Sequence, residues 1–261
     1  MNTGDVKSAG RVLDLLELFA TSFEPLGVTS VSRSLGIPKS SAQGLLVTLA
    51  GRGYLVREGA GYVLPARLRQ GGWVGGVRAR LLEVAKPVLE RMAQQSGESA
   101  FIGVLSGNEV KYLAKALSSH EVRYDASLSR TRPVHSTSTG LAILAHSPPD
   151  FTDRILGKAK LRAVTPHTIT DRATIVAMLD RARRCGYAEV QDANVIGASG
   201  VAAPVFGGRG EVLAGLSIGV PTSRYKKIAK RLTEIVVDEA ATLSKRMTSF
   251  ERESAPSGSS G

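Results

Sequence analysis

The chain has 261 residues, of which 43% are hydrophobic and 22% are charged, and its formal net charge is +11 at pH 7. This length and composition predict a globular protein of one large or two smaller domains, and no apolar run approaches the roughly 20 residues that span a bilayer. Cys185 is the single cysteine, which excludes an intrachain disulfide and a metal site with several thiolate ligands.

The first ten residues are polar and lack the apolar core of a signal peptide, so we expect a cytoplasmic protein with no membrane partner. The positive net charge suits a polyanionic partner. Residues 1–75 hold eight Lys and Arg against five Asp and Glu, and the rest of the chain has the larger basic excess. Charge alone therefore does not locate a surface that binds nucleic acid.

The N-terminal part of the chain has the pattern of three helices. Apolar residues recur at helical spacing over residues 8–22. A second, short helix is expected to start at a cap formed by Thr29 or Ser30 and to end at Gly36. Pro38 suits the first turn of a third helix, because its missing N–H costs nothing there.

Two short strands are expected after the third helix, at residues 54–57 and 62–64. The Glu58-Gly59-Ala60-Gly61 segment between them suits the turn of a hairpin. The order helix, helix, helix, hairpin is that of a winged helix-turn-helix domain, which we place at residues 1–64. A domain of this kind predicts a DNA-binding protein whose partner is double-stranded DNA.

The third helix is expected to be the recognition helix, which must bury one face and present the other to the major groove. Its apolar face would consist of Ala42, Leu45, Leu46 and Leu49. The residues expected to contact DNA are Lys39, Ser40, Ser41, Gln43, Gly44 and Val47, together with Arg57 on the wing. Lys39 and Ser40 start the helix, where free N–H groups favour phosphate, and Gln43 can pair with adenine. A plain three-helix packing unit would have the same apolar face.

Residues 65–77 are rich in glycine and predict a linker to a second domain at residues 78–250. Helices are expected there at about 81–95, 137–146, 150–157, 171–184 and 225–249. Strands are expected at 99–106, 109–117, 121–128, 200–206 and 211–220. The Ser- and Gly-rich end, residues 251–261, is expected to be a disordered tail.

The chain resembles the IclR (isocitrate-lyase-regulator) family of transcription regulators over nearly its whole length. Ile37-Pro38-Lys39-Ser40-Ser41 resembles the segment that opens the family's recognition helix, and Arg52-Gly53-Tyr54 resembles the one that opens its wing. Further similar segments follow in the family order: VAKPVLERM at 84–92, HSTSTGLAILA at 135–145, AVTPHTIT at 163–170, VAAPV at 201–205 and LSIGVPTSR at 216–224. Each segment is weak evidence, but the ordered set is specific.

The resemblance implies an α+β fold class, with an N-terminal winged helix-turn-helix and a C-terminal GAF-like effector-binding domain. That second domain would have a curved antiparallel sheet and helices. The implied function is transcription regulation by binding to operator DNA under the control of a small effector. The implied assembly is a homodimer, with dimers often paired into tetramers.

The resemblance also implies that the effector lies between the sheet and the start of a helix. A run of hydroxyl side chains at 136–139 precedes an apolar helix, and free N–H groups there suit a carboxylate, although Ser and Thr are also ordinary caps. The expected effector-binding residues are Thr137, Ser138, Thr139, Gly140, Gly197, Gly200, Ser217 and Gly219. Glycines in the strands would let a ligand approach the backbone closely.

Several residues depart from the family pattern. Gly200 stands where a Cys is common, and Gly219 stands where a Ser is common. Val190 lies near a common Asp, and Leu141 stands where a Lys often follows the helix start. These changes predict a less polar and roomier pocket, and hence a small organic acid that is bulkier or partly aromatic. Gly44 stands where an Arg is common, so the operator sequence is not predicted.

Two other functions compete with this one. Residues 215–219 match the G-x-S-x-G motif of serine hydrolases, but the serine lies inside one continuous strand, whereas the motif needs a strand, a sharp turn and a helix. Nucleotide-binding glycine patterns are missing and the four histidines lack metal-ligand spacing, so we expect no enzyme and no cofactor. The alternative that stays open is a DNA-binding regulator whose C-terminal domain only oligomerises, without an effector.

Overall fold

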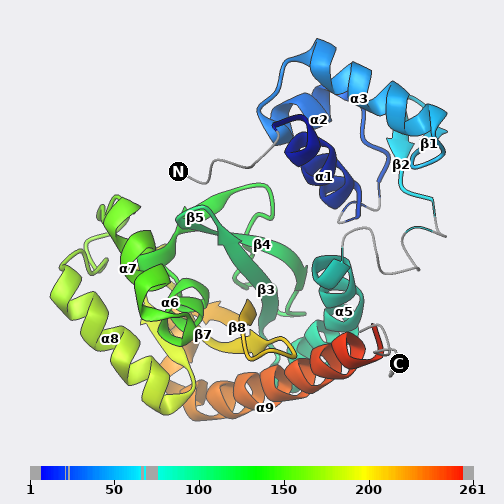
Figure 1. Ribbon diagram of the computed structural model, residues 1–261. Coiled ribbons are helices and arrows are strands. Elements are labelled where there is room, and N and C mark those ends of the chain that lie inside the picture. Colours follow the sequence, from blue (N-terminus) through cyan, green and yellow to red (C-terminus); the bar gives the residue numbers. More distant parts are fainter. Residues whose placement is uncertain (1–6, 21, 23, 66–67, 69–75, 255–261) are drawn as a thin grey trace, which may run out of the picture. The chain divides into compact units, whose positions relative to one another are not determined.

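The computed structural model describes residues 7–20, 22, 24–65, 68 and 76–254 (Figure 1). The chain forms two compact units, residues 1–83 and residues 84–261, and helix α5 (Gly76–Ser96) runs from one into the other. Most of the expected linker at 65–77 lies outside the described residues.

The first unit contains the expected three helices and hairpin. Its elements are α1 (Lys7–Ala20), α2 (Val28–Leu35), α3 (Lys39–Gly51), β1 (Val56–Glu58) and β2 (Gly61–Val63). The helices enclose a core that includes Leu15, Phe19, Val31 and Leu46. The two strands pair antiparallel, and Leu26 adds a further bridge to Tyr62. This arrangement confirms the helix-turn-helix part of the predicted fold.

The ends of the second and third helices differ from the sequence prediction. α2 starts at Val28 with Gly27 at its N-cap, so Thr29 and Ser30 lie inside the helix and cap nothing. Pro38 stands at the N-cap of α3 with extended backbone, one position before the expected first turn. Gly36 ends α2 as predicted, at φ +63°, a left-handed conformation that glycine adopts without steric cost.

The second unit is built on one six-stranded antiparallel sheet. The strands are β3 (Ser99–Ser106), β4 (Glu109–Ala116), β5 (Thr131–Pro133), β6 (Ala188–Gln191), β7 (Ala198–Phe206) and β8 (Val212–Pro221). They lie in the order β5-β4-β3-β8-β7-β6. The central strands β3 and β8 therefore pair residues that lie more than 100 positions apart in sequence.

Helices cover both faces of this sheet. α6 (Ser138–His146), α7 (Pro149–Lys158) and α8 (Arg172–Cys185) lie on one side, whereas α5 and α9 (Thr222–Ser254) lie on the other (Figure 1). Residues 199–205 of β7 and 214–220 of β8 are all buried. A sheet with one face in solvent would instead show alternating burial. Arg91 of α5 forms an ion pair with Glu239 of α9 at 2.6 Å.

Two predictions for the second unit are wrong. Residues 121–128 form no strand; the segment 117–130 is an irregular loop, and the next strand is the short β5. Residues 251–254 belong to α9, so this part of the expected tail is helical, and residues 255–261 lie outside the described residues. Within the part of the chain that the structure describes, no helix is both long and apolar enough to cross a membrane.

Candidate functional site

The outer face of α3 is exposed along its length. Its exposed residues are Lys39, Ser40, Gln43, Gly44, Val47 and Thr48, and Ser41 is half-buried. On the opposite face Ala42, Leu46 and Leu49 are buried in the core of the unit, and Leu45 is half-buried. Lys39 is the one charged side chain of this helix, and it stands at the first position. A partner of this face would thus meet one cation at the helix start and neutral groups beyond it.

Gly44 lies in the middle of this outer face. A Cβ atom at this position would have no heavy atom within 4 Å, so packing inside the protein does not require a glycine. The position leaves a shallow, side-chain-free strip between Gln43 and Val47, where another molecule can approach the backbone closely.

The hairpin next to α3 exposes a second cation. Arg57 lies on β1 opposite Tyr62 of β2, and all three residues of β1 are exposed. Gly59 adopts φ +58° in the turn, a left-handed conformation that favours glycine. Arg57 and the first turn of α3 are therefore both open to solvent within the first unit.

A small hollow of about 30 Å³ lies in the second unit, where the start of α6 faces β7 and β8. Five of the expected effector-binding residues line it: Thr137, Ser138, Gly200, Ser217 and Gly219. The other lining residues are Phe101, Tyr112, Tyr124, Val190, Asn194, Val195, Ala198, Ser199 and Ile218. Thus the described lining contains hydroxyl, amide and aromatic groups, and no Lys, Arg, Asp or Glu.

The start of α6 offers hydrogen-bond donors to this hollow. Thr137 is the N-cap, and its Oγ1 accepts the N–H of Gly140 at 3.1 Å. The first N–H groups of an α-helix have no partner within the helix, which leaves those of Ser138 and Thr139. Among the described residues the Ser138 hydroxyl also makes no hydrogen bond. Gly140 does not line the hollow; a Cβ there would lie 2.2 Å from the Val134 carbonyl oxygen.

Thr139 does not line the hollow either, because its side chain ties α6 to the sheet. Its hydroxyl donates to Ser217 Oγ at 3.1 Å and lies 3.3 Å from the Tyr112 hydroxyl. Ser217 in turn points at the carbonyl oxygen of Phe101, at 3.5 Å. Burial raises the pKa of Tyr112 above its ordinary value, so the phenol stays neutral.

The two strand glycines have different neighbours. A Cβ at Gly200 would lie 3.1 Å from Ser138 Oγ, so this glycine permits the close approach of the helix start. A Cβ at Gly219 would lie 2.4 Å from a ring carbon of Tyr124 and 3.2 Å from one of Phe101. The expectation of a roomier pocket is therefore wrong at Gly219, since Tyr124 fills that space. The aromatic wall of the hollow consists of Phe101, Tyr112 and Tyr124.

Gly197 lies outside the hollow. It has φ +84°, its N–H donates to Asp192 Oδ1 at 2.7 Å, and its carbonyl accepts from the N–H of Thr222 at 2.8 Å. The positive φ explains the glycine without a ligand. Asn194 of the same turn does line the hollow, and its Oδ1 accepts from Ser136 at 3.2 Å, which leaves its amide N–H groups as further donors.

Sequence reasoning missed the aromatic residues of the wall. Phe101 and Tyr112 lie on adjacent strands with ring centroids 5.1 Å apart, so strand alternation could have directed both inward. Tyr124 lies in the irregular loop, where the alternating pattern predicts a strand that does not form, so the pattern gives no guide to this ring. In the described part of the chain, no group of three or more His, Cys, Asp or Glu is placed to hold a metal ion.

Both units match known protein families. Residues 8–59 match the IclR helix-turn-helix domain, and residues 77–245 match the family described as bacterial transcriptional regulator IclR C-terminal. The chain belongs to the IclR family of transcriptional regulators. As an IclR-family member it is a regulator and not an enzyme, and Ser217 lies in mid-strand, where the hydrolase motif would need a turn into a helix.

Similar IclR-family proteins cover nearly all of the chain. The HTH-type transcriptional regulator BhcR of Paracoccus denitrificans (strain Pd 1222) is 32% identical over 247 residues, which is 93% of this chain and 88% of BhcR. An IclR homolog from Microbacterium hydrocarbonoxydans, solved in complex with 4-hydroxybenzoate, is 28% identical with a TM-score of 0.67 and covers 92% of this chain and 99% of its own. An IclR transcriptional regulator from Alicyclobacillus acidocaldarius is 25% identical with a TM-score of 0.68, covering 93% and 99%.

Proposed function

We propose that this IclR-family regulator binds operator DNA through α3 and the wing, and that a small aromatic carboxylate in the hollow of the second unit controls that binding. One observation carries the effector part: the start of α6, with Thr137 and Ser138, and an aromatic wall line the same hollow. In domain terms, residues 1–64 would bind DNA, and residues 78–250 would bind the effector and form the homodimer.

The carboxylate would lie at the start of α6. There the N–H group and the hydroxyl of Ser138 and the Asn194 amide can donate to its oxygens. The N-terminal end of a helix also carries a partial positive charge, which favours an anion. Since no Lys or Arg is among the described lining residues, these dipoles and hydrogen bonds must hold the charge.

The aromatic part of the ligand would lie among Phe101, Tyr112 and Tyr124. The Phe101 ring is 5.1 Å from that of Tyr112 and 5.7 Å from that of Tyr124, centroid to centroid. Tilted and edge-on arrangements are the ones that aromatic pairs prefer, and the ring of the ligand would add a further member to this cluster. The 4-hydroxybenzoate complex of the relative from Microbacterium hydrocarbonoxydans supports this ligand class.

On DNA, Lys39, Ser40, Ser41 and Arg57 would contact phosphates, whereas Gln43 and Val47 would meet base edges across the strip left by Gly44. A phosphate contact carries no sequence information, whereas a glutamine can pair with adenine and an apolar group can touch the methyl of thymine. Helix-turn-helix proteins usually bind as dimers to two half-sites, so the operator should be an inverted repeat.

The effector part can be tested with the full chain by thermal unfolding and calorimetry. The ligands would be benzoate and 4-hydroxybenzoate, with pyruvate as a non-aromatic acid and benzamide as an uncharged ring of similar shape. We expect the two benzoates to raise the melting temperature, because a ligand that binds the native state stabilises it by mass action, and we expect benzamide not to. If no acid binds, the result favours the alternative, in which the C-terminal domain only oligomerises.

A further inference from the structure

Tyr124 lines the hollow from a loop, and its side chain makes no hydrogen bond among the described residues. It lies in the loop 117–130, which makes no strand pairing, and its side chain is half-buried. The ring covers Gly219 and meets Phe101 edge-on at 68°. Among the described residues its hydroxyl has no hydrogen-bond partner. Packing alone therefore holds this side chain in place.

Two other walls of the hollow are held by polar contacts. The start of α6 is tied to the sheet through Thr139 and Ser217. The turn at 192–197 is held through its backbone: Thr165 donates to the Asp192 carbonyl and Thr168 donates to the Ala193 carbonyl, both at 2.6 Å. A hollow of 30 Å³ holds about two water molecules. An aromatic acid needs more room, and the Tyr124 ring, which no hydrogen bond holds among the described residues, is a wall that can yield it.

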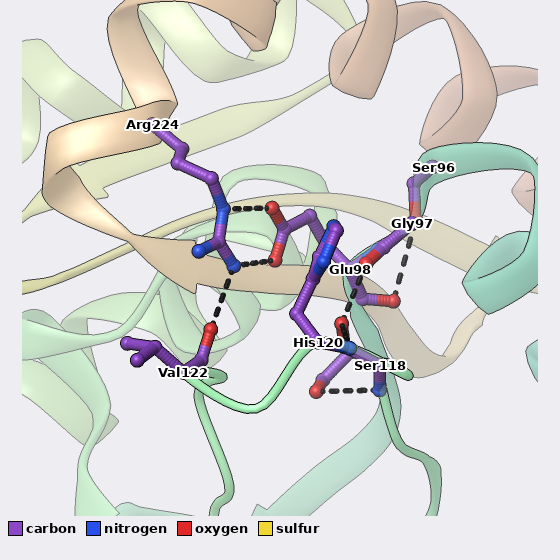
Figure 2. Close-up of polar contacts among 8 residues, drawn as sticks. Ser96, Gly97, Glu98, Ser118, His120, Val122 and Arg224 are labelled. Atoms are coloured by element: carbon purple, nitrogen blue, oxygen red, sulfur yellow. Dashed lines mark hydrogen bonds and ion pairs between the residues drawn. The ribbon is translucent and has the colours of Figure 1, made fainter.

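The backbone next to Tyr124 is held by an arginine that also forms an ion pair with a buried glutamate (Figure 2). Arg224 in the first turn of α9 donates through Nε and Nη2 to the two carboxylate oxygens of Glu98, at 2.6 and 2.8 Å. The same Nη2 donates to the Val122 carbonyl oxygen at 3.0 Å. Glu98 is 1% exposed, so its charge depends on this partner.

Further bonds fix the loop on both sides of Tyr124. Ser118 donates to the Gly97 carbonyl at 2.6 Å, directly beside Glu98 (Figure 2). Beyond the tyrosine, Lys115 donates to the Ala126 carbonyl at 3.2 Å. The loop backbone is thus pinned before and after a ring that is itself held only by packing. This arrangement fixes where the ring stands and leaves its side-chain torsions free to change.

We propose that Tyr124 determines the size of the effector that this regulator accepts, and that Arg224 positions it by holding the Val122 carbonyl. The proposal rests on the effector site proposed above. Displacing the ring opens the space over Gly219 to a larger ligand, and with the ring in place that space is closed. Arg224 is a positioning residue, because it reaches the ligand only through the loop.

The first experiment measures the size selectivity of the full chain by calorimetry with benzoate and 2-naphthoate. Tyr124→Ala should shift the ratio of the two dissociation constants at least tenfold towards 2-naphthoate. Tyr124→Phe keeps the ring and should leave the ratio unchanged. An unchanged ratio in a Tyr124→Ala variant that still binds overturns the inference alone. If neither acid binds the unchanged chain, the proposed effector site itself fails.

The second experiment tests the positioning role of Arg224. In Glu98→Gln/Arg224→Gln both charges are removed together, so no unpaired buried charge remains. Its selectivity should shift in the same direction as that of Tyr124→Ala, and in a chain that already carries Tyr124→Ala it should produce no further shift. Val122→Ala is the matched control, because that side chain is 71% exposed and its carbonyl is retained. A lower melting temperature with an unchanged ratio would make the ion pair merely structural and overturn the role of Arg224.

Should the double variant fail to fold, Ser118→Ala releases the same loop from the Gly97 carbonyl without touching a charge. We expect it to shift the ratio in the same direction by a smaller factor, because Val122 stays bound. If Ser118→Ala and Tyr124→Ala bind both acids as the unchanged chain does, the loop does not set the size of the pocket.

Discussion

The Thr139 hydroxyl in α6 donates to the Ser217 hydroxyl in β8 over 3.1 Å, both of them buried. This contact fixes the start of α6 to the centre of the sheet. Ser217 is therefore engaged within the protein, and in the proposed site it acts on the ligand mainly by placing the helix start.

Ser217→Ala should weaken both folding and effector binding. The Thr139 hydroxyl would lose its buried acceptor, which costs about 1 kcal/mol of the free energy of unfolding. The shift of the helix start should lower the affinity for an aromatic carboxylate about tenfold, which corresponds to roughly 1.4 kcal/mol. Denaturant unfolding and calorimetry measure the two effects. An unchanged affinity would show that this contact does not position the effector site.

Ser138→Ala should separate binding from stability. Its hydroxyl faces the hollow and, among the described residues, makes no hydrogen bond, so its loss should leave the melting temperature within about 1 °C of the unchanged chain. A hydrogen bond to a charged group contributes about 1.5–3 kcal/mol, so the affinity for benzoate should fall at least about tenfold. If Ser138→Ala and the unchanged chain bind benzoate with equal affinity, the carboxylate does not lie at Ser138.

On α3, Lys39→Ala and Gln43→Ala should have different effects on DNA binding. Loss of a phosphate contact should weaken binding to operator and scrambled duplexes alike and reduce the salt dependence. Loss of a base contact should instead lower the ratio of operator affinity to scrambled-duplex affinity. The loss of discrimination should correspond to about 1–3 kcal/mol. Fluorescence anisotropy across salt concentrations distinguishes the two effects. A Gln43→Ala variant with the original ratio would show that Gln43 reads no base.

His135 should make the stability of the second unit depend on pH. Burial lowers the pKa of its imidazole, and the 3.1 Å contact with the Arg162 carbonyl opposes this only in part. The unfolded chain therefore takes up a proton below about pH 6.5 that the folded chain resists, so stability falls as the pH is lowered through that value.

The melting temperature of the His135→Gln variant should consequently fall less steeply between pH 7.5 and 5.5 than that of the unchanged chain. His167 is exposed, and His167→Gln is the matched control that should keep the original slope. The slope is the quantity compared, since replacing a buried histidine also lowers stability at every pH. Three equal slopes would mean that His135 is not the titrating group.

Strong local patterns allowed most elements to be predicted from the sequence. The buried face of α3 and the cap at Thr137 follow from helical spacing and from the preference of hydroxyls for helix starts. The predicted strand at 121–128 has a good alternating pattern, but its carbonyl groups at Val122 and Ala126 accept from Arg224 and Lys115 instead of from a neighbouring strand. Those partners are tertiary, and no local pattern shows them.

The same reason applies at the candidate site. Arg224 pairs with Glu98, which lies 126 positions away in the chain, and no local pattern shows that pairing. Gly219 predicts an open space, yet a loop from another part of the sheet fills it with the Tyr124 ring. Residue type predicted the chemistry of the helix start, whereas the shape of the pocket depends on long-range packing.

The most direct test measures operator affinity with and without the effector. A duplex selected from a randomised library by the full chain would be titrated in the absence and presence of saturating 4-hydroxybenzoate. We predict at least about a fivefold change in affinity, the lower end of typical coupling between sites. Gly200→Leu, whose side chain would displace Ser138 Oγ, should bind the duplex normally and lose the response. An operator affinity that stays the same when the acid is bound would contradict effector control of DNA binding. A Gly200→Leu variant that still responds would contradict the proposed effector site.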